Sequence, residues 1–212
     1  MIYLNKEAVS PVVGVMLMLV VTIVIAAVVS AFAGGLSSSE QKTISAYFSS
    51  EVNVESVVGT MHYSSGNPTT YTYPVGYNGE NNYILFEHKG GDSFNLNDIE
   101  IQLENNANKM TFRASDKPVT DLSISCRDDP TNKTRFEEIG EDADEFIMPG
   151  DQFKMVFDGN YVSSYDNSKY LFFYKEGAGA GFGFEINKKY NYMIIDRSTK
   201  KVIHSGTLLA TL

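Results

Sequence analysis

The 212-residue chain has no tryptophan and a single cysteine, Cys126. One cysteine cannot form an internal disulfide, and it excludes the cysteine-rich class of zinc cluster. Basic residues are also few, because 17 Lys and Arg face 26 Asp and Glu, which gives a formal net charge of −9. This acidic balance argues against nucleic acid as a partner, since a phosphate backbone attracts a basic face.

Charge is absent from one long segment, Ala8–Ser39. Within it, the apolar run from Val12 to Leu36 would form a helix of roughly 37 Å at about 1.5 Å per residue. That length is enough to cross a hydrocarbon core of about 30 Å with some tilt. Pro11 suits the first turn of a helix, where its missing N–H costs nothing, and Ser10 suits the N-cap.

The end of this helix is predicted from the residues that follow it. The pair Gly34–Gly35 predicts a kink or a break in the helix. The apolar spacing of Ile44, Tyr47 and Phe48 then predicts that the helix resumes or continues to about Ser50.

Two general interpretations of the apolar run are a secretory signal peptide and a plain membrane anchor. A signal peptide finds a small-x-small cleavage site in Ala31-Phe32-Ala33. However, the apolar core is about twice the usual 7–15 residues, and Lys6 is the only positive charge before it. A plain anchor holding an outer domain fits the length without these difficulties.

The start of the charge-free segment favours a third interpretation. A short leader, Met1–Glu7, precedes Ala8-Val9-Ser10-Pro11-Val12-Val13-Gly14-Val15-Met16-Leu17-Met18 and an uninterrupted aliphatic helix. This arrangement resembles the N-terminal segment of archaeal type IV pilins, over about the first 35 residues. The resemblance implies that a prepilin peptidase cleaves between Glu7 and Ala8, and that the apolar helix is kept in the mature protein.

Two related families differ at these positions. Bacterial type IV pilins carry a glutamate at the fifth position after the cleavage site, whereas this chain has Val12 there. Register between subunits would then depend on apolar packing alone. Archaellins, the motility relatives, usually lack the Ala8–Pro11 opening, so a pilin is the preferred interpretation and an archaellin-like subunit is an alternative.

A helix that is apolar on every side must lie in lipid or in a bundle of helices. The resemblance implies both in turn: the precursor lies in the cell membrane, and identical subunits then polymerise into a helical cell-surface filament. The further partners implied are the prepilin peptidase, a pilus assembly ATPase and a membrane platform protein. The residues expected in the filament core are Pro11, Val12, Gly14, Leu17, Val20, Ile23, Ala27 and Phe32.

Beyond Ser50 the sequence is typical of short strands separated by turns. The predicted strands are Val52–Val58, Tyr83–His88, Ile99–Leu103, Met110–Arg113, Phe153–Phe157, Tyr170–Tyr174, Tyr190–Ile195 and Lys201–His204. The turn signals are Gly66-Asn67-Pro68, Asn78-Gly79, Gly90-Gly91-Asp92, Pro149-Gly150-Asp151 and Asp158-Gly159-Asn160.

These patterns predict an α+β protein, in which a long N-terminal hydrophobic helix is followed by an antiparallel β-sandwich-like (Ig-like) globular domain. The domain boundaries follow from the same patterns. We expect a prepilin leader at residues 1–7, the hydrophobic helix at residues 8–50 and an extracellular β-rich headpiece at residues 51–212.

Possible chemical sites in the headpiece have simpler explanations. His88 with Glu87 and Asp92 could form a metal corner, but a strand-end histidine at a tight turn is the preferred interpretation. Gly177–Gly183 lacks the Lys-Ser or Lys-Thr of a phosphate loop, so a flexible hairpin or a close-packed strand is favoured. A run of acidic residues lacks the spacing of a helix-loop-helix calcium site and is interpreted as a solvated loop. Its members are Glu137, Glu138, Glu141, Asp142, Asp144 and Glu145.

Two surface features remain as predictions. Asn132-Lys133-Thr134 is an N-glycosylation sequon, so Asn132 is a predicted glycosylation site. A group of tyrosines could form an adhesive patch or could pack in the core. They are Tyr63, Tyr71, Tyr73, Tyr77 and Tyr83.

The sequence shows no nucleophile elbow, and it predicts no catalytic residue, cofactor or metal site. We therefore expect a non-enzymatic structural subunit of an archaeal type IV pilus that serves adhesion and surface attachment. The alternative of a different class is a single-span, membrane-anchored extracellular β-domain that acts as a binding module.

Overall fold

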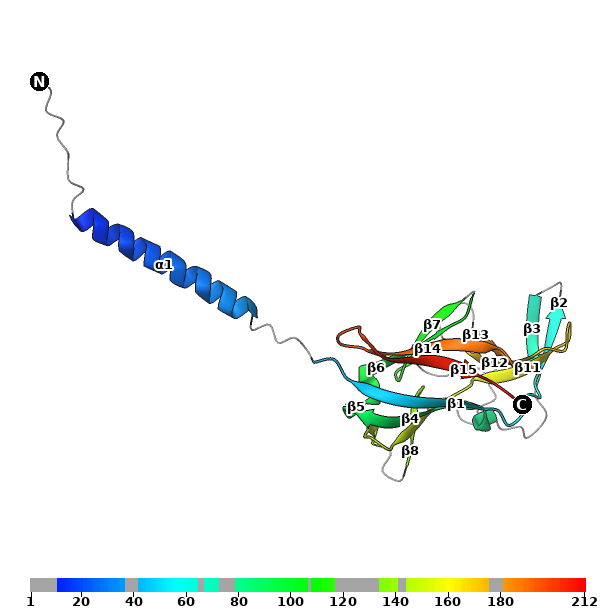
Figure 1. The fold of residues 1–212 in the computed structure, drawn as a ribbon. Coiled ribbons are helices and arrows are strands. Elements are labelled where there is room, and N and C mark those ends of the chain that lie inside the picture. Colours follow the sequence, from blue (N-terminus) through cyan, green and yellow to red (C-terminus); the bar gives the residue numbers. More distant parts are fainter. Residues whose placement is uncertain are drawn as a thin grey trace, which may run out of the picture. The chain divides into compact units, whose positions relative to one another are not determined.

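The computed structural model describes residues 11–36, 42–64, 67–72, 79–106, 108–116, 134–140, 144–175 and 181–212. The chain divides into two compact units, Met1–Gln41 and Lys42–Leu212 (Figure 1). The first unit contains one helix, α1 (Pro11–Leu36), and the second contains all the described strands. We call the second the β unit. The expected α+β class, with a long apolar helix followed by a strand-rich, β-sandwich-like domain, is confirmed.

The helix α1 starts at Pro11, as expected for a residue that suits the first turn. Its end differs from the prediction, because the Gly34–Gly35 pair lies within the helix, which ends at Leu36. The predicted helical continuation to Ser50 is wrong, since Ala46–Asn53 form strand β1. The spacing of residues 44, 47 and 48 fits the 3.6-residue period of a helix, but residues 44, 46 and 48 also fit the two-residue period of a strand. Pairing of β1 with β4 decides in favour of the strand.

The first sheet of the β unit is antiparallel and contains β1. Its strands, in spatial order, are β1 (Ala46–Asn53), β4 (Tyr83–Gly91), β10 (Gln152–Val156) and β8 (Glu137–Ile139). Side chains alternate along β1, so that Phe48 and Val52 are buried while Tyr47 and Ser49 are exposed. This alternation is the period of two that a half-buried strand requires.

A second antiparallel sheet packs against the first. Its strands, in spatial order, are β15 (Val202–Leu209), β14 (Lys189–Asp196), β6 (Ile99–Glu104) and β7 (Lys109–Arg113). Phe86 of β4 meets Tyr192 of β14 with ring centroids 5.4 Å apart. At the edges, Tyr47 of β1 meets His204 of β15 at 5.2 Å, and the two strands lie side by side (Figure 1).

The third sheet has five strands, of which one adjacent pair is parallel. Its strands, in spatial order, are β13 (Phe182–Glu185), β12 (Lys169–Phe173), β11 (Gly159–Ser163), β2 (Thr60–Ser64) and β3 (Asn67–Thr72). The parallel pair is β11 with β2. Phe173 of β12 meets Phe112 of β7 at 5.4 Å, so this sheet shares the core with the second sheet. The remaining elements are the pair β5 (Phe94–Asn95) and β9 (Phe146–Ile147), and two short 3-10 helices at Gly79–Asn81 and Leu96–Asp98.

Seven of the eight predicted strands are confirmed within two residues at their starts, as β4, β6, β7, β10, β12, β14 and β15. One predicted strand and three predicted turns differ from the structure, since Asn67 and Pro68 belong to β3 and Gly90 and Gly91 belong to β4. The strand expected over Val52–Val58 ends at Asn53. The turn expected at Asp158–Asn160 is only partly a turn, because Gly159 and Asn160 belong to β11. Asn160 is completely buried, and its Oδ1 accepts hydrogen bonds from the N–H groups of Val58 and Gly59, which places a polar residue inside a strand.

A buried ion pair lies at the centre of the β unit. Arg135 and Asp158 are both completely buried, and Arg135 Nη1 donates to both carboxylate oxygens of Asp158 at 2.9 and 2.8 Å. Arg135 Nη2 donates to the backbone oxygen of Tyr174 at 2.9 Å, and the Tyr174 N–H donates to Asp158 Oδ2 at 2.7 Å. The guanidinium also lies over the ring of Phe112, 5.4 Å from its centroid. These contacts compensate both charges for the loss of water.

Candidate filament-core helix

The helix α1 exposes its apolar side chains on all sides. Among its large side chains from Val12 to Phe32, the exposed fraction ranges from 46% at Val21 to 71% at Met18. The segment Val12–Phe32 is long and apolar enough to cross a membrane, and none of it is buried within the chain itself. Such a surface is unfavourable in water, so it requires lipid or neighbouring helices.

No charged group interrupts this surface, and the described hydroxyl contact is internal. Neither the first nor the last turn of α1 carries an acidic or basic residue. The hydroxyl of Thr22 donates to the backbone oxygen of Leu19 at 2.8 Å. A hydroxyl bonded to its own helix in this way is tolerated in an apolar environment.

The eight residues expected in the filament core all lie in α1. Pro11 is the first residue of the helix. The other seven have exposed positions, namely Val12, Gly14, Leu17, Val20, Ile23, Ala27 and Phe32. At about 100° per residue, they are distributed around the helix rather than along one stripe. The structure therefore offers apolar contacts in several directions, as a helix surrounded by neighbours needs. The leader cleavage position, Glu7–Ala8, lies outside the described residues.

The segment Lys42–Ser45, which we call the neck, is the start of the β unit and has neither helix nor strand structure. Two aspartates hold it. Asp92 accepts hydrogen bonds from Lys42 Nζ at 2.8 Å and from the Ser45 N–H at 3.1 Å, and its own N–H donates to the Ser45 oxygen at 2.7 Å. Asp196 Oδ2 accepts a hydrogen bond from the Ile44 N–H at 3.1 Å.

Asp196 is almost fully buried and makes one hydrogen bond to the neck, whereas Asp92 is more exposed and makes three. Burial opposes the ionisation of Asp196, but hydrogen bonds from Ser198 Oγ and from the N–H groups of Ile44, Thr199 and Ser198 outweigh this effect. Together they lower the pKa of Asp196 from 3.8 to about 2. At Asp92, the hydrogen bond from Lys42 and that from the Ser45 N–H lower the pKa of the carboxyl. The neck is therefore bound by two carboxylates that stay ionised in mild acid.

Comparison with protein families gives a match to the family described as Archaeal Type IV pilin, N-terminal, over residues 7–47. This segment is an archaeal type IV pilin N-terminal domain by that match. Searches of curated proteins and of solved structures gave no significant match. The resemblance noted in the sequence is thereby confirmed, and the matched segment, which we call the pilin domain, is longer than the motif that suggested it.

The pilin domain includes more than the apolar helix. It contains all of α1, the whole neck and the first two residues of β1, Ala46 and Tyr47. The aspartates that hold the neck lie outside it, at the end of β4 and at the end of β14. Two sheets of the β unit thus supply the anchors for the C-terminal end of the pilin domain.

The histidine considered as a metal corner is a core residue. His88 is completely buried, stacked on Phe48 at 5.2 Å and edge-on to Phe94 at 5.6 Å. Within the described residues, neither nitrogen of its ring has a hydrogen-bond partner. Glu87 lies next to His88 on β4 and so faces the opposite side of the sheet, where it pairs with Lys89. The described part of the chain contains no group of three His, Cys, Asp or Glu residues that could hold a metal ion.

The acidic run is partly built into the structure. Glu137 pairs with Lys154 at 3.5 Å, and Glu138 Oε2 accepts a hydrogen bond from the Glu145 N–H at 2.8 Å. Asp144 caps the Phe146 N–H at 2.8 Å, while Glu141 and Asp142 lie outside the described residues. Glu137 and Glu138 thus belong to strand β8, while Asp144 and Glu145 are exposed, as expected for a solvated loop.

Of the remaining sequence candidates, Asn132 and most of the tyrosine group lie outside the described residues or have undescribed side chains. Tyr83 lies at the start of β4, with Lys154 Nζ 5.7 Å from its ring centroid. In the glycine-rich segment, a Cβ at Gly181 would lie 2.8 Å from the backbone oxygen of Phe173, which agrees with a close-packed strand. The interpretation of this segment as a flexible hairpin is untested at residues 176–180, which are not described.

Sequence reasoning missed the neck anchors and the Arg135–Asp158 pair. For Asp196 a signal existed, because Asp-Arg-Ser at 196–198 fits a turn in which the Asp side chain accepts backbone N–H groups two and three residues on. The buried pair joins residues 23 positions apart, and its two partners meet only through the tertiary fold.

Proposed function

We propose that this chain is the structural subunit of an archaeal type IV pilus and that its helix α1 forms the filament core. The observation that carries the proposal is the match of residues 7–47 to the pilin domain, together with a helix whose apolar side chains are exposed on every side. The β unit would form the outer surface of the filament. The proposed role is structural and involves no enzymatic activity.

The physics of the helix supports assembly. In lipid, helix pairing gains little from the hydrophobic effect, and packing of small residues matters more. Ala27 and Ala31 lie four residues apart, and so on the same side of α1, where they allow close approach of a neighbouring helix. Once out of the membrane, each large side chain of α1 gains about 1.5–3 kcal/mol by burial against neighbours.

Identical copies that associate head to tail, with a rotation that does not close a ring, form an open helical filament. Removing α1 from lipid is unfavourable until neighbours cover it. The proposed partners are therefore a prepilin peptidase that cleaves between Glu7 and Ala8, a pilus assembly ATPase and a membrane platform protein. The precursor would reside in the cell membrane before assembly.

The N-terminus of the native protein tests the processing step. Mass spectrometry of protein sheared from the cell surface should give a mature chain that starts at Ala8. An intact Met1 in membrane-bound protein, with no filaments, would support the membrane-anchored β-domain instead. A start at Gly34 would indicate a secreted domain and would exclude a helical filament core.

The role of the filament is tested in cells. We propose that it serves adhesion and surface attachment, so deletion of the chain should reduce attachment and leave swimming unchanged. Loss of swimming with normal attachment would favour the archaellin-like alternative. Electron microscopy of the sheared fraction, with this protein identified by peptide mass, ties either result to the filament itself.

Glycosylation at Asn132 is a separate proposal, based on the sequon in an extracellular domain. The variant Asn132→Gln should lower the mass of the native protein by that of the glycan. The variant Asn105→Gln, at an asparagine that lies in no sequon, serves as a control and should change the mass only by the substitution itself. An unchanged glycan mass in Asn132→Gln removes the proposal.

A further inference from the structure

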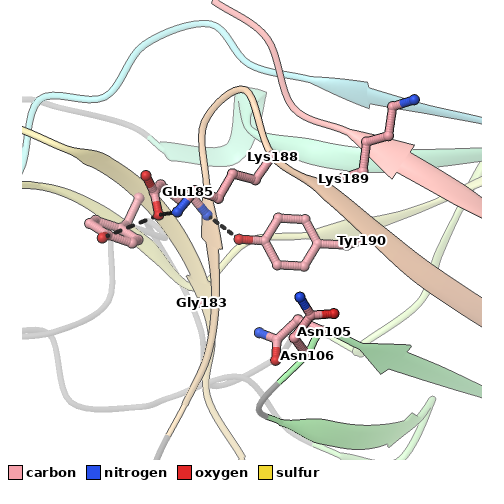
Figure 2. A pocket seen from close by; sticks show the side chains of 8 residues that line it. Asn105, Asn106, Gly183, Glu185, Lys188, Lys189 and Tyr190 are labelled. Atoms are coloured by element: carbon pink, nitrogen blue, oxygen red, sulfur yellow. Dashed lines mark hydrogen bonds and ion pairs between the residues drawn. The ribbon is translucent and has the colours of Figure 1, made fainter.

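A cavity of about 340 Å³ lies where the hairpin β13–β14 meets the loop after β6. Its volume is at the lower end of the range of about 300–1,000 Å³ typical of small-ligand sites. Figure 2 shows Asn105 and Asn106 of the loop beneath the ring of Tyr190, with Gly183 and Glu185 of β13 on the adjacent wall. Polar and apolar atoms both line it. None of the functions argued above uses it.

Gly183 opens this cavity at a place where a strand normally carries a side chain. It lies in the middle of β13, between the buried residues Phe182 and Phe184. A glycine inside a strand often marks a bulge or a close approach by another backbone or by a ligand. The pairing of β12 with β13 runs without a register shift, so Gly183 is not at a bulge. A Cβ built on Gly183 meets no atom within 4 Å, so no described backbone approaches it either.

The side chains beside Gly183 combine an aromatic face with hydrogen-bonding groups. Tyr170 pairs with Glu185 across β12 and β13, and residues two apart on a strand share a face, so both lie on the same face as Gly183. The ring of Tyr170 stacks on Tyr161 at 4.9 Å with an interplanar angle of 19°. The hydroxyl oxygen of Tyr190 accepts the Glu185 N–H at 2.7 Å, which fixes that ring against the cavity.

Charge in the cavity is largely balanced. Lys188 Nζ forms an ion pair with Glu185 Oε2, which also contacts the Tyr170 hydroxyl at 3.5 Å. Lys189, the other cation at the site, points away from Asn105 and Asn106 in Figure 2. The lining thus offers amide, hydroxyl, carboxylate and ammonium groups without a strong net charge. Such a set of donors and acceptors suits a neutral ligand with many hydroxyl groups.

We propose that this cavity binds one neutral sugar unit of a glycan. The amides of Asn105 and Asn106 would bind hydroxyl groups, and the space above Gly183 would admit the C–H face of a pyranose ring next to Tyr170. Sugar binding at this cavity depends only on the β unit. The use of the cavity as the adhesive contact of the filament rests on the function proposed above. One weak site per subunit gives strong attachment only when many subunits bind together.

The test uses the full-length protein in a zwitterionic detergent that contains no sugar headgroup. Saturation-transfer NMR and calorimetric titration are carried out with methyl α-mannoside, methyl β-galactoside and N-acetylglucosamine. Glucuronate serves as the anionic comparator and glycerol as a polyol without a ring. We expect saturable binding of at least one neutral sugar and none of glycerol.

The decisive variant is Gly183→Val. Valine suits a strand, and its Cβ would enter open space, so the variant should fold normally and occupy the part of the cavity directly above residue 183. We expect binding to weaken at least tenfold. The matched control is Ser49→Val, which adds the same side chain at an exposed position of β1 in another sheet and should bind like the wild type. If Gly183→Val does not fold, Asn106→Ala truncates an exposed side chain of the same cavity and should weaken binding as well.

Three results would overturn the proposal: no saturable binding of any neutral sugar, binding that Gly183→Val leaves unchanged, or a preference for glucuronate over every neutral sugar. These results are distinct from failure of the pilus function. Filaments should assemble normally from Gly183→Val, whereas a chain that binds sugar but forms no filaments would retain this site and lose the function proposed above.

Discussion

Val20 of α1 is 57% exposed, while Phe86 of β4 has no exposed surface at all. The same contrast holds throughout both regions, because α1 has large apolar side chains and no core, whereas the β unit encloses a core of phenylalanine, isoleucine and tyrosine. Charge is divided in the same way. Lys6 and Glu7 cancel and Ala8–Ser39 carries none, so the net charge of −9 lies entirely beyond Ser39.

This difference indicates where each region finds its stability. The β unit completes its own contacts, including compensation of the buried Arg135–Asp158 pair. The helix is not covered by its own chain, so its apolar side chains require lipid or other helices. A perturbation of α1 should therefore change assembly without unfolding the β unit, and a perturbation of the β unit should change its stability without changing the apolar surface of α1.

The largest effect is expected from Val20→Asp. In the proposed filament core this carboxylate would be buried without a partner, at a cost of several kcal/mol in every subunit. We expect no filaments in the sheared fraction by electron microscopy, whereas Val20→Leu should assemble normally. The urea unfolding of the β unit should be the same in both variants. Normal filaments from Val20→Asp would show that α1 does not pack in an apolar core.

The converse perturbation is Arg135→Met. It leaves Asp158 buried without its cation, and removing one partner of such a pair typically costs about 3–5 kcal/mol. Tyrosine fluorescence during urea unfolding measures the loss, since the chain has no tryptophan. The control is Arg113→Met, because Arg113 pairs with Glu100 at 2.7 Å but is 45% exposed, and it should cost less than about 1 kcal/mol. Equal losses of unfolding free energy in Arg135→Met and Arg113→Met would contradict a larger contribution of the buried Arg135–Asp158 pair to stability.

How far the sequence predicts this structure also differs between the two regions. The apolar surface of α1 follows from the absence of charge, and Pro11 marks its start, but its end was predicted wrongly, because Gly34 and Gly35 lie within the helix and residues 46–50 belong to β1. In the β unit, strands with strict alternation such as Ile99–Leu103 were predictable, because their period of two is visible locally. Strand β11 was not, since Asp158-Gly159-Asn160 has the composition of a turn.

The features of the β unit that the sequence did not predict depend on contacts between segments that are distant in the sequence. Asn160 becomes acceptable in a strand only because the N–H groups of Val58 and Gly59 reach its side chain from a distant segment. Likewise, Phe48 is part of a strand because β4 lies beside it, and its local spacing alone fits a helix. The neck anchors and the cavity at Gly183 depend on the same kind of contact and were not predictable, whereas the exposed apolar residues of α1 were predictable from the local sequence.

A smaller effect, and one that depends on pH, is expected from Asp196→Asn. The pKa of Asp196 is about 2 in the folded chain, against 3.8 as the ordinary value. A lowered carboxyl pKa stabilises the fold above the ordinary value, and this contribution is lost as the pH falls through the folded value. The shift corresponds to about 2 kcal/mol.

Urea unfolding between pH 6 and pH 2 measures this contribution. The wild type should lose about 2 kcal/mol between roughly pH 4 and pH 2, relative to Asp196→Asn, which lacks the titrating group. The variant Asp92→Asn removes the more exposed neck anchor and should retain most of the wild-type pH dependence. A wild type and an Asp196→Asn variant with parallel pH profiles would show that the hydrogen bonds to Asp196, from its own turn and from the neck, do not depend on its charge.

The smallest effect is expected from His88→Phe. The ring of His88 is buried between Phe48 and Phe94, and within the described residues its nitrogens have no partner. Phenylalanine keeps the stacking and removes polar atoms whose burial is unfavourable, so the change should be neutral or stabilise the β unit by up to about 1 kcal/mol. The control His88→Ala removes the ring and should cost about 2–4 kcal/mol through the cavity it leaves. A clear loss of stability in His88→Phe would mean that the imidazole nitrogens make a contact that the core requires, and His88 would then be a polar anchor of the β unit.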